Sequence, residues 1–301
     1  MTAAGPRTAA AGDEDAVVAL WGEAFGEPGM AAQWRLDPVH RSWTLVTGDD
    51  HGIMAALYLV DQRRRTAHGR VARVLGIANV AVARRARGQG LARELMDDAV
   101  AFGRRAGYDW ALLFTGTPGV YAGSGFLPFR QHRRLVGTLA DAAASGPLGV
   151  ERTPIESVDP ATLASAYDSA CTDRPLTAVR DGLGWLRARG WYAGSTLYRH
   201  AGGYAVARPA AGEVLEAAGR PDALAALGHA IRDDLRAAGA AAVSAQLPAG
   251  QPFDALLAVV VAEGERPADD TGMFHPLDSG ADAVRVTVEH PRAHHWAGDY
   301  L

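Results

Sequence analysis

Residues 80–93 have the composition and order of a phosphate-binding turn. An apolar strand at Val80–Val82 leads into a loop of arginines and glycines, and the residues after Gly90 keep the spacing of an amphipathic helix. Such a turn directs several backbone N–H groups and the positive end of a helix at one point, where a pyrophosphate could bind. Gly88 and Gly90 lack a Cβ, so a ligand could approach the backbone closely. Four arginines could add charge for phosphate oxygens: Arg84, Arg85, Arg87 and Arg93.

The spacing within this loop excludes two common phosphate loops. No Lys-Ser or Lys-Thr pair follows the glycines, so it is not a Walker loop, and the third glycine of a dinucleotide-binding fingerprint is absent. What remains is the order Arg-x-x-Gly-x-Ala, formed by Arg87-Gly88-Gln89-Gly90-Leu91-Ala92. This order resembles the coenzyme A pyrophosphate loop of the GNAT superfamily of N-acetyltransferases. The alternative is an ordinary strand–turn–helix corner whose arginines face water.

A second block about thirty residues further on strengthens the resemblance. Residues 109–115 read as a buried strand, and residues 119–127 read as a short helix, a glycine stop and another strand. The family carries an aromatic residue four positions before a Gly-Phe pair at this place, and Tyr121 with Gly125-Phe126 matches that pattern. The resemblance therefore covers residues 8–135.

The resemblance implies acetyl-CoA as the co-substrate, bound largely through the backbone. The strand before the loop would hold the thioester carbonyl and the pantetheine arm through Val80, Ala81 and Val82. The pyrophosphate would bind across the loop and the first helical turn, at Arg87, Gly88, Gln89, Gly90, Leu91, Ala92 and Arg93. Thr117, together with Thr115, could contact the pantetheine arm after the next strand.

Acyl transfer to an amine needs a proton donor for the leaving thiolate and a proton acceptor for the ammonium. Tyr121 is the expected general acid, and a core tyrosine with a satisfied hydroxyl is the alternative. Many family members use a glutamate on the strand before the loop as the base, but no acidic residue lies between Thr66 and Val82. Four replacements stay open: the terminal carboxylate of Leu301, which the resembling survival-type enzymes would suggest, and the side chains of Asp299, Glu27 and His132.

Composition indicates an ordinary globular protein with room for two domains. The chain has 301 residues, 48% of them hydrophobic and 21% charged, and a net charge of −4 gives no general attraction to nucleic acid or membranes. Its single cysteine, Cys171, excludes an internal disulfide and a cysteine-based zinc site. Adjacent His294 and His295 would point apart, so we predict no metal. With neither a signal peptide nor an apolar run of membrane-spanning length in the sequence, we expect a cytoplasmic protein.

The order of elements predicts an α/β (α+β) fold made of two GNAT-like domains, each a mixed, mostly antiparallel sheet flanked by helices. The first domain would span 1–141, the linker 142–150 and the second domain 151–301. In the first domain we expect a solvated hairpin tip at 61–69 and a final strand at 130–139 that completes the sheet. Further elements are expected at residues 13–25, 43–46, 53–60, 71–82, 159–167, 197–207, 213–218, 221–237 and 241–247.

The second half repeats this plan without a usable cofactor loop. Its corresponding turn, Gly219-Arg220-Pro221-Asp222, lacks the Arg-x-x-Gly-x-Ala spacing and places Asp222 where an anion would bind. Tandem domains of this kind resemble the N-terminal two-thirds of the enhanced-intracellular-survival acetyltransferases. The second domain would then form part of the acceptor site, or a subunit interface. Candidate aromatic residues for an acceptor pocket between the domains are Trp34, Trp43, Trp185, Trp191 and Tyr192.

These observations predict an N-acyltransferase that moves an acetyl or other acyl group from acyl-CoA to the primary amine of a small molecule by direct attack. Two alternatives stay open: a carrier-protein thioester as the donor, and a non-catalytic acyl-CoA-binding module. We expect no nucleic-acid or membrane partner and leave a homodimer open. The acceptor and the acyl chain length do not follow from the sequence.

Overall fold

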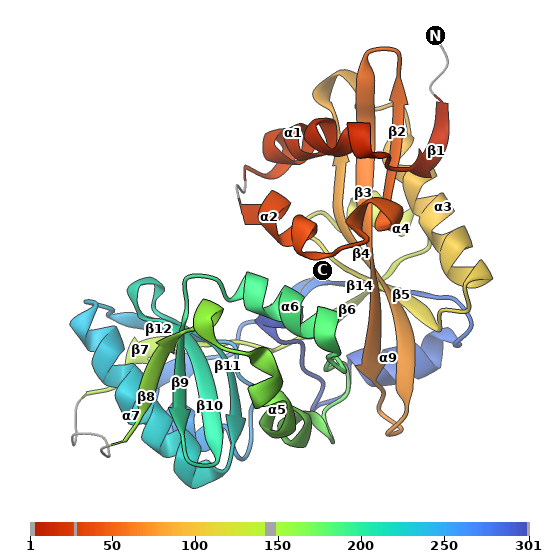
Figure 1. Cartoon of the computed structure of the whole chain (residues 1–301). Helices are drawn as coiled ribbons and strands as arrows, with labels where there is room; N and C mark the ends of the chain where they lie inside the picture. Colours follow the sequence, from red (N-terminus) through yellow and green to blue (C-terminus); the bar gives the residue numbers. More distant parts are fainter. Residues whose placement is uncertain (1–3, 27–28, 142–148, 300–301) are drawn as a thin grey trace.

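A computed structural model describes residues 4–26, 29–141 and 149–299 (Figure 1). The chain forms two lobes, each built on one seven-stranded sheet, as the tandem arrangement predicted. Within the described ranges, every helix is too short or too polar to cross a lipid bilayer.

The first sheet combines antiparallel strands with one parallel pair, β4 and β5. Its strand order is β1-β2-β3-β4-β5-β14-β6. The bounds are β1 Ala4–Thr8, β2 Thr44–Asp49, β3 Gly52–Arg65, β4 Val71–Val82, β5 Trp110–Phe114, β6 Leu127–Gln131 and β14 Asp269–Pro276.

Helices cover both faces of this sheet. On one face lie α1 (Glu14–Phe25) and α2 (Gly29–Leu36), and on the other lie α3 (Leu91–Arg105) and the short α4 (Gly119–Ala122) (Figure 1). The apolar stripe of α3 has the predicted helical spacing and enters the core at Leu91, Leu95, Met96 and Ala99. A further helix, α9 (Ala281–Val288), packs beside β14 and β6.

The second sheet has the order β13-β7-β12-β11-β10-β9-β8, and its one parallel pair is β11 with β12. The bounds are β7 Leu135–Leu139, β8 Glu151–Pro154, β9 Thr196–His200, β10 Gly203–Arg208, β11 Glu213–Gly219, β12 Ala242–Ala245 and β13 Val261–Glu265. Its helices are α5 Ala164–Cys171, α6 Gly182–Trp191, α7 Pro221–Ala237 and α8 Asp254–Val260. The predicted mixed, mostly antiparallel fold is therefore confirmed for both sheets.

The two sheets exchange a strand, which corrects the prediction for residues 130–139. Only β6 belongs to the first sheet, whereas β7 crosses over and pairs with β12 and β13 of the second. In return β14, from the C-terminal part of the chain, lies between β5 and β6 (Figure 1). Alternating apolar residues predict a strand but not its neighbours, because any strand edge offers the same backbone groups. The contiguous division at 142–150 stays a prediction for the chain, and residues 142–148 lie outside the described ranges.

The expected solvated hairpin tip at 61–69 is correct only in part: a turn with exposed His68, Gly69 and Arg70 is present, but it is shorter than predicted. Strand β3 continues to Arg65, and the Arg64 side chain is fully buried against the second half of the chain. Its guanidinium donates hydrogen bonds of 2.9 Å to the carbonyl oxygens of Leu176 and of Asp299. Satisfied hydrogen bonds make burial of this cation tolerable, and the polar composition alone gave no sign of them.

Candidate active site

The neighbouring strands β4 and β5 separate at the centre of the first sheet. Their parallel pairing ends at Gly76 and Leu112, while β4 continues to pair with β3 as far as Val82. The β3–β4 register also shifts next to Asn79, whose φ of 53° is unusual for a residue other than glycine. Among the described residues, no strand pairs with the β5-facing edge of β4 beyond this point, so its backbone can hydrogen-bond to a ligand.

A cavity of about 360 Å³ occupies this opening. Its floor comes from β4, its far wall from the end of β5 and α4, and its rim from α1, α2 and α6. The lining residues are Phe25, Met30, Ile77, Ala78, Asn79, Val80, Leu113, Phe114, Thr115, Gly116, Thr117, Tyr121 and Trp191. Of the three predicted strand contacts, Val80 lines the cavity, whereas Ala81 and Val82 pair with β3 just beyond it.

Tyr121 reaches the cavity from α4 and is 9% exposed. Burial raises the pKa of its phenol, and a hydrogen bond with Thr115 acts in the opposite direction. The group therefore keeps its proton at neutral pH, as a general acid must. The glycine of the Gly-Phe pair is required here because Gly125 has a φ of +80°, and a Cβ would lie 3.0 Å from the imidazole of His275.

The two threonines after β5 form a small polar wall beside this tyrosine. The hydroxyls of Thr115 and Thr117 are 3.2 Å apart, and the Thr117 N–H donates to the Thr115 hydroxyl over 3.0 Å. The backbone N–H of Thr115 is held by the Thr271 carbonyl of β14. The exchanged strand thus helps to place the residues that line the cavity.

The loop before α3 has the backbone geometry that the sequence predicted. Gly88 and Gly90 adopt left-handed conformations with φ of 79° and 82°, and a Cβ at either position would point into open space. Gly90 is the N-cap residue of α3, and no side chain caps the helix. The first N–H bonded within the helix is that of Glu94, so the amides of residues 91–93 are available to an anion.

The loop arginines divide into two groups. Arg84 and Arg85 form ion pairs with Glu23 at 3.1 Å and Asp49 at 3.0 Å, and so tie the loop to neighbouring elements. Arg93 approaches Asp97 one helical turn later at 3.8 Å. Arg87 is exposed and takes part in none of the ion pairs among the described residues. Arg87 is therefore the loop cation best placed to reach a ligand phosphate.

The structure describes two of the four candidate bases, Asp299 and His132, and neither lines the Tyr121 cavity. Asp299 is buried and held by Arg180 at 2.6 Å and by the Tyr167 hydroxyl at 3.0 Å. His132 is exposed and hydrogen-bonds to the Arg266 carbonyl at 3.0 Å. Glu27 and Leu301 lie outside the described residues.

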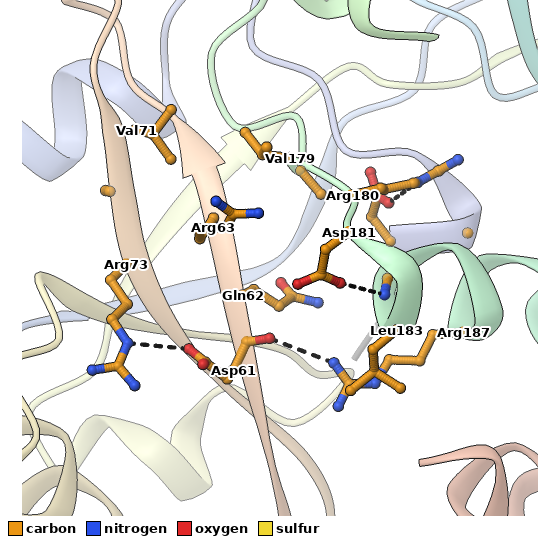
Figure 2. Close-up of a pocket in the computed structure, with 15 residues that line it drawn as sticks. Asp61, Gln62, Arg63, Val71, Arg73, Val179, Arg180, Asp181, Leu183 and Arg187 are labelled. Atoms are coloured by element: carbon orange, nitrogen blue, oxygen red, sulfur yellow. Dashed lines mark hydrogen bonds and ion pairs between the residues drawn. The ribbon is translucent and has the colours of Figure 1, made fainter. Parts of the chain in front are cut away.

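A second cavity of about 250 Å³, which the sequence did not predict, lies where α6 meets the β3–β4 hairpin (Figure 2). Its walls carry an ion pair between Arg73 and Asp61 and a hydrogen bond from Arg187 to the Asp61 backbone. Arg187 also binds Asp37 of the first half at 2.5 Å. These contacts fix α6 on the first sheet. As a result Trp191, alone among the five proposed acceptor aromatics, lines the Tyr121 cavity.

The corresponding turn of the second sheet has no loop. Strand β11 ends at Gly219 and α7 begins at Pro221, so a single residue, Arg220, separates them. Asp222 lies in the first helical turn and pairs with Arg220 at 3.0 Å, which holds the pKa of its carboxyl below the usual range. The second sheet therefore has no glycine loop at this turn, and the absence of a cofactor site from the second domain stays a prediction.

Comparison with known proteins agrees with this geometry. Residues 6–129 match the family model of the acetyltransferase (GNAT) domain. This part of the chain is therefore similar to acetyltransferase (GNAT) domains. Comparison with curated protein sequences gave no match.

Solved structures share the fold across both halves of the chain. A GCN5-related N-acetyltransferase from Kribbella flavida is 21% identical, with a TM-score of 0.71 over 95% of this chain and 73% of that one. A GCN5-related N-acetyltransferase from Anabaena variabilis is 14% identical, with a TM-score of 0.68 over 92% and 73%. Eis1 from Mycobacterium abscessus is 13% identical, with a TM-score of 0.65 over 91% and 74%. The tandem fold is thus common to all three.

Proposed function

We propose that the protein is an acyl-CoA-dependent N-acyltransferase that moves an acetyl group to the primary amine of a small molecule. One observation carries this proposal: the opening between β4 and β5 ends on a buried tyrosine, and an uncapped helix with a glycine loop follows β4 directly. The opening between the strands could hold a thioester, and the loop with the helix N-terminus could hold the diphosphate of the same acyl-CoA. The match of residues 6–129 to an acetyltransferase domain supports the same chemistry.

The reaction would be a direct transfer between two bound substrates. The amine nitrogen attacks the thioester carbon, a C–N bond forms and the C–S bond breaks. Backbone groups at Val80 would polarise the carbonyl, and the Tyr121 phenol would protonate the leaving sulfur. The proton lost by the amine needs a separate acceptor. The residues proposed for the diphosphate are those of the loop, with Arg87 as the side-chain contact.

The acceptor would enter beside α6. Trp191, Phe25 and Met30 form the apolar rim of the cavity on that side. The tail of the chain runs along the same helix, because the Gly298 N–H donates to the Tyr192 hydroxyl over 2.8 Å. This position supports the proposal that the carboxylate of Leu301 accepts the amine proton, with Glu27 as the competing candidate.

The experiment that tests the function is a screen of amines by thiol release from acetyl-CoA, followed by Tyr121→Phe. Loss of a general acid lowers turnover by about 100- to 10,000-fold, while acetyl-CoA affinity measured by calorimetry stays the same. Tyr108→Phe is the control, because it also removes a buried phenol but lies away from the cavity. Turnover of Tyr121→Phe within about threefold of the parent would exclude this role for Tyr121.

A further inference from the structure

The second domain contains a third cavity, of about 720 Å³, that the proposed reaction does not use. It lies between α5, the β9–β10 turn, the junction of β11 with α7, and the loop after β12. Its volume is within the range of small-molecule sites.

Positively charged side chains predominate in the lining of this cavity. Four arginines and one carboxylate line it: Arg174, Arg199, Arg220, Arg292 and Asp173. Three of the arginines have acidic partners at the surface, namely Glu151 for Arg199, Asp222 for Arg220, and Asp173 for Arg292. Exposed pairs of this kind contribute little to stability, so an anionic ligand could replace or share these partners at low cost.

Arg174 differs from the other three because it is buried. Its side chain belongs to a residue that is 3% exposed, and its Nη2 donates to the Gln251 carbonyl over 3.2 Å. The guanidinium carbon lies 4.7 Å from the centre of the Phe253 ring. Among the described residues no carboxylate forms an ion pair with it. Burial, followed by the nearby Arg292, lowers the pKa of Arg174, and the charges of Asp173 and Asp254 offset this only in part.

Small residues keep the space in front of these cations open. The α5 wall carries Ser165, Ala166, Ser169 and Ala170, and the opposite wall carries Gly202 and Gly203. A Cβ at Gly202 would lie 3.0 Å from the Arg220 guanidinium carbon. This glycine therefore lets Arg220 lie flat against the turn at the edge of the cavity.

We propose that this cavity binds a phosphate-bearing small molecule, with Arg174 as its buried contact and Arg199, Arg220 and Arg292 at its rim. The ligand would be held by charge-assisted hydrogen bonds to planar guanidinium groups, which match phosphate oxygens in pairs. The second domain, which has lost the loop for a cofactor, would then keep an anion site of its own. A free inorganic anion and a nucleotide present the same chemistry to it.

The test is hydrogen exchange of the full chain, followed by mass spectrometry, with inorganic pyrophosphate and AMP as separate probes. We expect slower exchange in residues 162–174 and 199–204 with at least one probe. Protection by AMP alone would indicate a nucleotide, and protection by both would indicate that the phosphate suffices. Arg292→Gln and Arg199→Gln should each weaken binding of the probe by about tenfold, and Arg174→Gln should weaken it by more.

Arg130→Gln is the matched control, because Arg130 is an exposed arginine paired with Asp270 in the other domain. If Arg174→Gln does not fold, the two rim variants decide the outcome. Protection confined to residues 84–93, or equal affinity in Arg292→Gln and Arg130→Gln, would overturn the proposal. Neither result bears on the proposed acyl transfer, which depends on thiol release and on Tyr121.

Discussion

The Nε of Arg180 lies 2.6 Å from Oδ1 of Asp299, and both side chains are buried. Arg180 also donates to Glu216 over 3.0 Å, and Tyr192 and Tyr204 donate to the same carboxylate. The network joins the tail of the chain to the segment that precedes α6. Its consequence is energetic, because a buried charge that loses its partner remains desolvated.

Asp299→Asn should therefore lower the free energy of unfolding by about 3 kcal/mol, since it removes one of the two carboxylates that balance Arg180. Denaturant unfolding measures this loss. Arg130→Gln serves as the comparison, because it breaks an exposed ion pair that contributes less than about 1 kcal/mol. Equal losses in the two variants would show that the buried network contributes no more than a surface pair.

Stability should depend on pH through two buried histidines. Burial, followed by nearby arginines, holds the pKa of His294 and that of His295 well below the usual value. Both imidazoles are then neutral in the folded protein, whereas the unfolded chain binds protons below about pH 6.5. Their contribution is complete above that pH and is lost as the pH falls below it, at up to about 1.4 kcal/mol per pH unit for each group.

Denaturant unfolding at about pH 7.5 and at about pH 5, which lie on either side of the ordinary histidine pKa, measures this slope. His294→Asn should reduce it by about half, because one of the two imidazoles is removed. His51→Asn is the control, since His51 is exposed. An unfolding free energy that is flat over this interval would contradict the burial of neutral imidazoles.

The loop glycines give a test of anion binding that is separate from stability. Gly90→Ala should lower the free energy of unfolding by about 1–2 kcal/mol, because alanine is strained in the left-handed conformation of Gly90. The same substitution should weaken binding of coenzyme A by about tenfold or more, because the added Cβ would enter the space of the ligand. Gly239→Ala is matched to it, with a φ of +80° and open space for its Cβ, but it follows α7 in the other domain. Calorimetry with coenzyme A should distinguish the two, and equal affinity would exclude Gly90 from the site.

Trp191 should set acceptor affinity without affecting the donor. Trp191→Ala removes a large part of the apolar rim, so the KM for the acceptor should rise about tenfold while acetyl-CoA affinity stays within about threefold. Leu186→Ala, an exposed position on the same helix, should change neither quantity. An unchanged acceptor KM in Trp191→Ala would place the acceptor elsewhere in the cavity.

Much of the secondary structure in both domains followed from local sequence. The bounds of β4 and α7 agree with the predicted 71–82 and 221–237, because apolar spacing and a proline at the first helical position are local signals. The loop glycines were also identified from the sequence, as positions without a Cβ where a ligand could approach the backbone. The sequence alone thus determined the strand–loop–helix unit and the position of Tyr121 relative to Gly125.

Tertiary structure decided the rest. Pairing between β14 and β5, or between β7 and β12, joins segments more than a hundred residues apart, and backbone hydrogen bonding does not depend on side-chain type. Burial of Arg64 depends on its contacts with Leu176, His295 and Asp299. Placement of Trp191 in the cavity depends on how α6 docks against the first sheet. A residue's surroundings are set by the packing of the whole chain, so these parts of the site became visible only once the two sheets were placed together.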